Sequence, residues 1–302
     1  MKNNIRKTKS LYISILFFFL SILFISFGFF YDYYYSEKNL LSVLNLTDDT
    51  EITDVDNDEG KSSNNSKIIN PGEITDNSTL RDNIQKRYGI NIKYGDELSN
   101  YTVGGLSVNT LSDDTSINTA LRDLNYNLSL YPGGFFEEFS KKGLSLTVNL
   151  IKSFSTDNIT GITDSTNKDV IISIACDYSF AESINHEIYQ YIDKYISLNN
   201  GSYGNWNIYN PVDFTYGTRI ENYAYTRTKS SDSYFVNMYA EENEYEDRAS
   251  TFEYMMGNDH PPFFKLGSPI NNKADKISMM IKNYFVTASN DDSLYWNRYI
   301  KH

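Results

Sequence analysis

The strongest constraint on the fold is the segment 179–199, which has the residue spacing of a long helix buried along one side. Its apolar residues recur at intervals of three and four, the period of an α-helix, at Ala181, Ile184, Ile188, Tyr191 and Tyr195. A polar row projects from roughly the opposite face and consists of His186, Gln190 and Asp193. Because side chains four residues apart are neighbours on a helix, His186 and Gln190 can reach the same ion.

His186 is followed by Glu187, and this pair begins a variant of a metal-binding motif. In the usual H-E-x-x-H form, two histidines one turn apart bind Zn²⁺ and the glutamate activates a water molecule. Gln190 stands where the second histidine would be. Its neutral amide oxygen is a poorer zinc donor than imidazole. The motif therefore predicts either a weakened HExxQ zinc site or a solvated polar face with a chance His-Glu pair.

A second segment, Tyr239 to Met256, enters a predicted helix through an acidic cluster. It resembles the downstream signature of the anthrax lethal factor-like zinc metallopeptidases, which include secreted clostridial Pro-Pro endopeptidases. The resemblance implies a zincin fold in which Glu246, seven residues after Tyr239, is the third zinc ligand and the Tyr239 hydroxyl assists catalysis. It extends over roughly residues 80–290, with weaker matches at 131–136 and 206–216.

Glu246 and Tyr239 also have structural interpretations. Asn243 can cap the helix with Glu246 at its third position, which is the arrangement of a capping box. Acidic residues also suit the positive end of a helix dipole. A cap and a metal ligand are compatible, whereas the alternative for Tyr239 is core packing. Neither His260, in a predicted turn, nor the terminal His302 is expected to replace the missing histidine.

The charge balance argues against a nucleic-acid-binding protein. The net charge is −12 and the pI about 4.7, whereas nucleic-acid binding usually needs a basic face. The 302 residues include one cysteine, Cys176, which excludes an intramolecular disulfide and is expected to be a buried small side chain. The length suits one sizeable domain with additional segments, and a monomer is expected.

The N-terminal segment has the pattern of a membrane anchor. A basic tail, 1–10, precedes an uncharged apolar run over 11–31, which is about the 20 residues that cross a bilayer. The basic side is expected to stay in the cytoplasm, with the later residues outside the cell. An uncleaved signal-anchor is favoured over a signal peptide, whose removal would leave a secreted protein. A disordered acidic linker is predicted for 32–78 and the metallopeptidase domain for 79–302.

The rest of the sequence predicts an α+β fold, with helices around a small mixed sheet. Apolar patterns predict strands at 90–94, 144–151 and 169–176. Helices are predicted at 81–87, 114–130, 135–139, 179–199, 243–256 and 273–285. Residues 201–236 predict a long irregular segment, of a kind that is often functional.

These features favour a zinc endopeptidase. Zn²⁺ would be held by His186, Gln190 and Glu246, weakly or conditionally because of the amide ligand. Glu187 would be the general base and Tyr239 the donor to the oxyanion. The alternative is a catalytically inactive zincin pseudoenzyme that binds a peptide or a surface protein, since a retained glutamate and a lost histidine fit either function.

The expected partner is an extended peptide or protein substrate. Such a substrate would pair with the strand ahead of the motif helix, 169–176, by strand addition. Aromatic residues between Trp206 and Tyr225 would line the cleft.

Overall fold

The computed structural model describes residues 76–156, 159–166, 168–177, 180–217, 234–258, 264–291 and 293–302, without the side chains of Ala181 and Glu182. The predicted membrane anchor at 11–31, most of the predicted linker and His260 lie outside the described residues. Within the described ranges, no helix has both the length and the apolar character needed to cross a bilayer.

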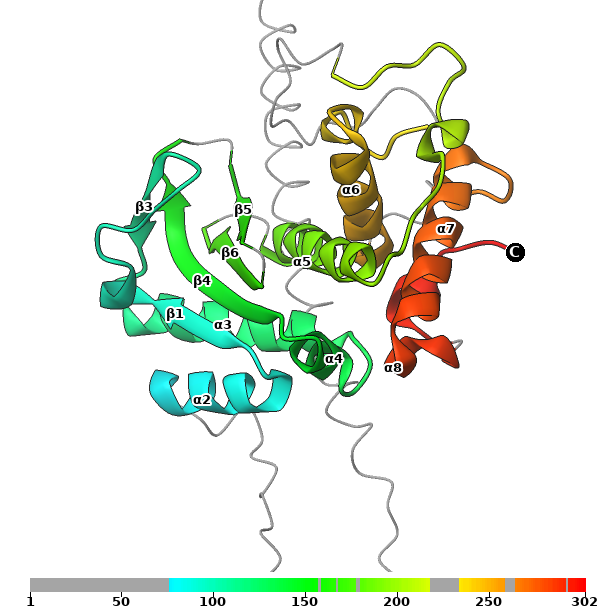
Figure 1. Ribbon diagram of the computed structural model, residues 1–302. Helices are drawn as coiled ribbons and strands as arrows, with labels where there is room; N and C mark the ends of the chain where they lie inside the picture. Colours follow the sequence, from blue (N-terminus) through cyan, green and yellow to red (C-terminus); the bar gives the residue numbers. More distant parts are fainter. Residues whose placement is uncertain are drawn as a thin grey trace, which may run out of the picture. The chain divides into compact units, whose positions relative to one another are not determined.

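The domain combines a mixed sheet with helices on both sides of a central helix, α5 (Figure 1). The strands are β1 (Asn91–Tyr94), β2 (Thr102–Val103), β3 (Leu106–Thr110), β4 (Ser145–Phe154), β5 (Gly161–Ser165) and β6 (Asp169–Ala175). The α-helices are α2 (Asn77–Tyr88), α3 (Asp114–Ser129), α4 (Phe135–Lys141), α5 (Phe180–Leu198), α6 (Glu244–Met256), α7 (Pro269–Tyr284) and α8 (Val286–Ser289). Short 3-10 helices are η1 (Gly95–Leu98), η2 (Trp206–Tyr209), η4 (Tyr239–Glu241) and η6 (Tyr295–Asn297).

The long strand β4 organises the sheet. On one side it pairs in parallel with β6, and on the other it pairs in parallel with β1 and antiparallel with β3. β5 pairs antiparallel with β6 and forms an outer edge of the sheet. Because both sides of β6 are already paired, it has no edge left for the substrate strand that the sequence predicts at 169–176. Among the described residues, the neighbouring strand β5 has an open edge at which an extended peptide could pair.

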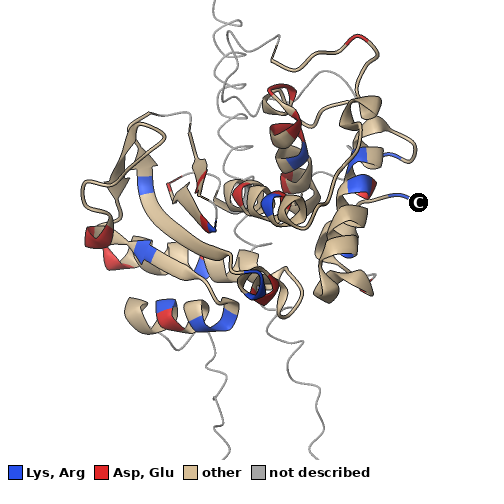
Figure 2. Cartoon of the chain, viewed as in Figure 1, with Lys and Arg blue, Asp and Glu red and all other residues tan. Residues whose placement is uncertain are grey.

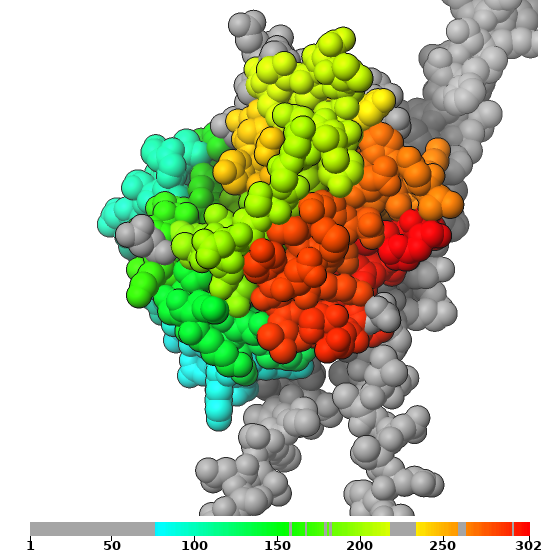
Figure 3. Space-filling model, turned by 45° about the vertical axis from the view of Figure 1, so that its right-hand side comes forward, coloured from blue at the N-terminus to red at the C-terminus, as the bar shows by residue number. Residues whose placement is uncertain are grey.

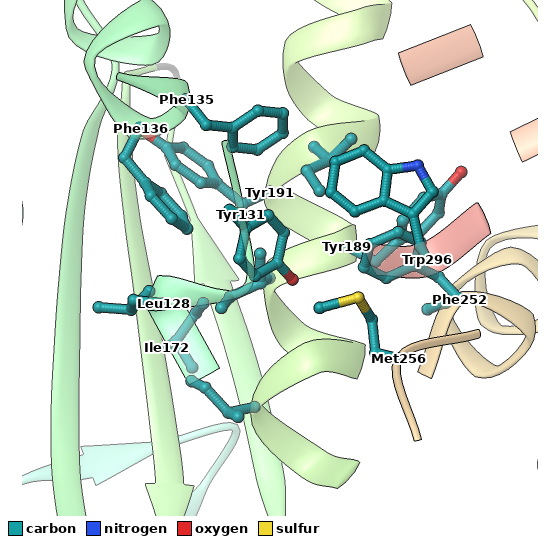
Figure 4. Close-up of a cluster of buried hydrophobic side chains, with 14 of the residues drawn as sticks. Leu128, Tyr131, Phe135, Phe136, Ile172, Tyr189, Tyr191, Phe252, Met256 and Trp296 are labelled. Atoms are coloured by element: carbon teal, nitrogen blue, oxygen red, sulfur yellow. The ribbon is translucent and has the colours of Figure 1, made fainter. Parts of the chain in front are cut away.

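Aromatic and aliphatic side chains hold α5 between the sheet and the C-terminal helices. Figure 4 shows Ile172 of β6 and Leu128 of α3 on one side of α5, with Phe252, Met256 and Trp296 on the other. Phe139 stacks on Tyr191 of α5 with ring centroids 3.9 Å apart, and Phe135 stacks on Phe285 at 4.4 Å. This core fixes α5 from both sides, which gives its polar row a defined position.

The predicted combination of helices with a small mixed sheet is confirmed, with differences at individual elements. The last long helix begins at Pro269 rather than at 273, because the Ser268 hydroxyl caps it by accepting from the Asn271 backbone at 3.2 Å and proline suits the first helical position. The first helix covers 77–88 rather than 81–87, with Asp76 as its cap. β2, β3 and β5 were not predicted. The residues of β5 are half-buried or exposed and lack an apolar alternation.

Candidate metal centre

His186 lies in the middle of α5 and is almost completely buried, with 2% of its surface exposed. Its Nε2 atom lies 2.8 Å from Oε2 of Glu246, and its Nδ1 atom lies 3.1 Å from Oε2 of Glu253. Both glutamates belong to α6, which packs against α5. Glu187, the next residue of α5, is 5% exposed. Burial of the His-Glu pair contradicts its interpretation as part of a solvated polar face.

The beginning of α6 positions Glu246. The Asn243 side chain accepts hydrogen bonds from the backbone N–H groups of Tyr245 and Glu246, at 2.9 and 3.0 Å. Asn243 is therefore the predicted helix cap, but the Glu246 carboxylate contacts His186 rather than completing a capping box. Acidic residues gather at this end of the helix (Figure 2), where they suit the helix dipole.

Glu187 points to the edge strand β5. Thr163 donates a hydrogen bond from Oγ1 to Oε2 of Glu187 at 2.6 Å. A Cβ atom at Gly161 would lie 2.6 Å from Oε1 of Glu187, so the glycine leaves room for this carboxylate. Close by, the Ser183 hydroxyl donates to Oγ1 of Thr160 at 2.9 Å. These contacts attach β5 to the first turns of α5 and orient the predicted general base.

Tyr239 lies beside the buried histidine. Its ring centroid is 5.7 Å from that of His186. Burial raises the pKa of the Tyr239 phenol well above its usual value, and the negative charges of Glu246, Glu242 and Glu187 raise it further. A hydrogen bond with Glu246 also raises this pKa, so the phenol keeps its proton across the physiological pH range and acts as a hydrogen-bond donor.

Gln190 lies one turn after His186 on α5 and is half-buried. The two ring nitrogens of His186 contact Glu246 and Glu253 rather than Gln190. Among the residues that the structure describes, no three His, Cys, Asp or Glu side chains form a metal-binding group. The structure thus brings together His186 and Glu246, two of the three predicted ligands.

The contact between His186 and Glu246 favours a cation at the ring. A neutral imidazole has one N–H, and ionised carboxylates only accept hydrogen bonds. Both contacts of the ring are favourable when His186 is doubly protonated, or when a metal ion replaces the proton on Nε2. Burial lowers the pKa of His186, but hydrogen bonds with Glu246 and Glu253 and the nearby carboxylate charges outweigh this effect and raise it to about 10.

The same pair fits a metal ion. Zinc–ligand bonds are about 2 Å long, so two ligands of a tetrahedral ion lie roughly 3.3 Å apart. The observed separation of 2.8 Å between Nε2 and Oε2 is a hydrogen-bond distance, so the two atoms would have to move apart by about 0.5 Å to hold an ion. Nitrogen from imidazole and oxygen from carboxylate are both common zinc donors.

Arg248 holds α5 and α6 together next to the site. Its guanidinium donates from Nη2 to Oδ2 of Asp193 at 2.8 Å, and its Cζ lies 4.5 Å from the ring centroid of Tyr203 and 4.8 Å from that of Tyr245. Asp193, the third member of the polar row on α5, therefore pairs with Arg248. This bridge between the helices keeps Glu246 close to His186.

Asp247 anchors the other side of the same helical turn. Its Oδ2 atom accepts hydrogen bonds from Trp206 Nε1 at 2.8 Å, Tyr216 OH at 2.7 Å and Lys273 Nζ at 2.7 Å. In Figure 3 the segment that contains Trp206, in yellow-green, lies against α7, in orange. The expectation that Trp206 lines a cleft is therefore wrong, because its indole is fully buried and bonded to Asp247. Residues 218–225 lie outside the described residues.

Two residues that contact the site, Glu253 and Thr163, are not predicted from the sequence. Glu253 has a detectable signal, since it follows Glu246 by seven residues and thus lies on the same face of a helix. Thr163 has none, because its role depends on the antiparallel pairing of β5 with β6, and the sequence of β5 does not indicate a strand.

The comparisons with known proteins identify a similar fold. No family model matches the sequence, and no curated protein matches it. A crystal structure of a "putative zinc-binding metallo-peptidase" from Bacteroides caccae matches with a TM-score of 0.50 and 15% sequence identity, over 74% of this chain and 91% of that protein. At this identity the likeness concerns the fold alone, and the chain therefore shares the fold of that protein.

Proposed function

We propose that this chain is a zinc-dependent endopeptidase of the lethal factor-like group, weakened by its HExxQ motif. The observation that carries the proposal is the contact between His186 Nε2 and the Glu246 carboxylate, 2.8 Å apart in a buried site. The fold shared with a metallopeptidase supports it. His186, Glu246 and Gln190 would hold the ion, which makes one nitrogen and two oxygen donors.

The side chains around this pair have the properties that peptide hydrolysis needs. A bound zinc ion would polarise the scissile carbonyl and make water more acidic. Glu187 takes the proton of the attacking water and returns it to the leaving amine. Thr163 holds one oxygen of the Glu187 carboxylate and thereby orients the group for this transfer. Tyr239 donates its phenolic proton in a hydrogen bond to the developing oxyanion. An extended peptide pairs with the edge of β5.

The location of the domain belongs to the same proposal. A signal-anchor at 11–31 holds the chain in the cell membrane, with the domain outside the cell, because basic residues precede an apolar run of spanning length. Protease added to intact cells should remove the domain from full-length protein, as judged by an antibody against a C-terminal tag. A domain that stays protected while a known surface protein is cleaved would contradict this orientation.

A second candidate function is an inactive zincin that binds a peptide or a surface protein. The observation in its favour is Gln190, a neutral amide at the position of a zinc-binding imidazole. The two candidates share the fold and differ in whether the site binds zinc and hydrolyses a peptide bond.

Replacement of Gln190 by histidine separates the two candidates. If Gln190 occupies a ligand position, Gln190→His should raise zinc affinity roughly tenfold or more, judging from the effect of changes around metal ligands. Affinity is measured by competition with a chromophoric chelator on the purified full chain. The control is Asn199→His, one residue past the end of α5 and away from the site, which should change nothing. If the natural chain and both variants bind zinc only at background level, the chain has no zinc site. The inactive zincin that binds a peptide or a surface protein is then favoured.

A further inference from the structure

Glu253 is a buried carboxylate without a role in the hydrolysis described above. Its side chain is 2% exposed. A carboxylate buried to this degree is costly unless it is paired or hydrogen-bonded. Its Oε2 atom lies 3.1 Å from Nδ1 of His186, on the ring nitrogen opposite the one that faces Glu246. The histidine ring therefore lies between two carboxylates.

The spacing of the two glutamates explains how one helix reaches both ring nitrogens. Seven residues are nearly two full turns, so Glu246 and Glu253 project from the same face of α6 about 10 Å apart along its axis. The ring of His186 extends from α5 into the gap between them, with Nε2 toward the first and Nδ1 toward the second. A carboxylate on Nδ1 can only accept a hydrogen bond, so it keeps the proton on that nitrogen.

We infer that Glu253 is the positioning residue of the metal centre, which holds the His186 ring by accepting the Nδ1–H and thereby leaves Nε2 to bind the metal ion. The inference rests on the proposed zinc site. Outer carboxylates of this kind orient the imidazole and increase its basicity. The effect is important in this chain because His186 is the one imidazole in a ligand set completed by an amide and a carboxylate.

The test uses the purified full chain with Glu253→Gln and Glu253→Leu. Zinc affinity should fall roughly tenfold or more in Glu253→Leu, within the range found for outer-sphere partners. Glu253→Gln should lose less, because its amide oxygen still accepts from Nδ1–H. The matched control is Glu138→Gln, which removes another buried carboxylate. Glu138 accepts hydrogen bonds from the backbone of Val286 and Thr287 in α8, and its replacement should leave zinc affinity unchanged.

A second measurement separates positioning from a general loss of structure. The natural chain and Glu253→Gln should show a slowly exchanging His186 Nδ1–H proton by NMR, and Glu253→Leu should lack it. Zinc affinity and an Nδ1–H signal that are both unchanged in Glu253→Leu would overturn the inference. If the natural chain and Gln190→His both fail to bind zinc, the proposed function is wrong. The Nδ1–H signal of the metal-free proteins then decides the role of Glu253 by itself.

Discussion

Replacement of Glu187 by alanine in the Gln190→His chain should abolish peptide cleavage while the zinc ion stays bound. Glu187 is expected to move a proton, and loss of a general base usually lowers the rate by about 10²–10⁴-fold. The zinc content should not change, because His186 and Glu246 make the contact that defines the site and Glu187 bonds to Thr163 instead. Cleavage of a peptide library and metal analysis of the same preparations measure the two quantities.

Glu187→Gln provides the isosteric version of this experiment, since the amide keeps the size of the side chain but cannot take a proton. Glu138→Gln is its control and should retain both cleavage and zinc. Loss of zinc from Glu187→Ala would mean that Glu187 is a metal ligand. Its assignment as the general base would then be wrong. Cleavage that persists in both variants would place the general base elsewhere.

Lys273→Met should destabilise the folded domain by about 3–5 kcal/mol, the usual cost of removing one partner from a buried ion pair. The side chains of Lys273 and Asp247 are both 0% exposed, and Nζ lies 2.7 Å from Oδ2. Nζ also donates to the backbone oxygen of Tyr234 at 2.8 Å. Without the ammonium group, the carboxylate of Asp247 stays buried without its counter-charge. Urea denaturation followed by tryptophan fluorescence measures the change.

Two further variants test the explanation. Lys276→Met changes a half-exposed lysine on the same helix and should stay within about 0.5 kcal/mol of the natural chain, as surface changes do. The double variant Lys273→Met, Asp247→Leu should recover much of the lost free energy, because no uncompensated charge remains. A single variant as stable as the natural chain would show that the pair does not support the fold.

The sequence identifies the helices of the site better than its strand. α5 and α6 have apolar periods, and α6 also has a cap at Asn243, so their positions follow from local rules. β5 has neither signal, because among the described residues one of its sides has no strand partner and its side chains are partly solvated. The contacts of Glu187 with Thr163 and Gly161 consequently depend on a pairing that only the folded chain reveals.

For individual polar residues too, the sequence predicts the position on a helix but not the role. Helical spacing places Asp193 on the same row as His186, but spacing cannot tell a metal ligand from a partner of Arg248. Trp206 is a similar case, because it lies in an irregular segment without a local pattern. The sequence cannot tell whether its indole lines a cleft or is buried as a hydrogen-bond donor to Asp247. Long-range pairing, rather than local pattern, decides these roles.

The attachment of α6 at Asp247 and Arg248 has an evolutionary consequence. Both residues follow Glu246 directly, and their bonds to Lys273, Trp206 and Asp193 do not involve the metal centre. In small metal-dependent domains, loss of a ligand unfolds the chain. Here the bonds of Asp247 and Arg248 do not include His186, Gln190 or Glu246, so mutation at position 190 leaves them in place and acts on the chemistry of the site. On the proposed function, a lineage with this architecture could therefore pass between enzyme and binding protein, in either direction, through folded intermediates.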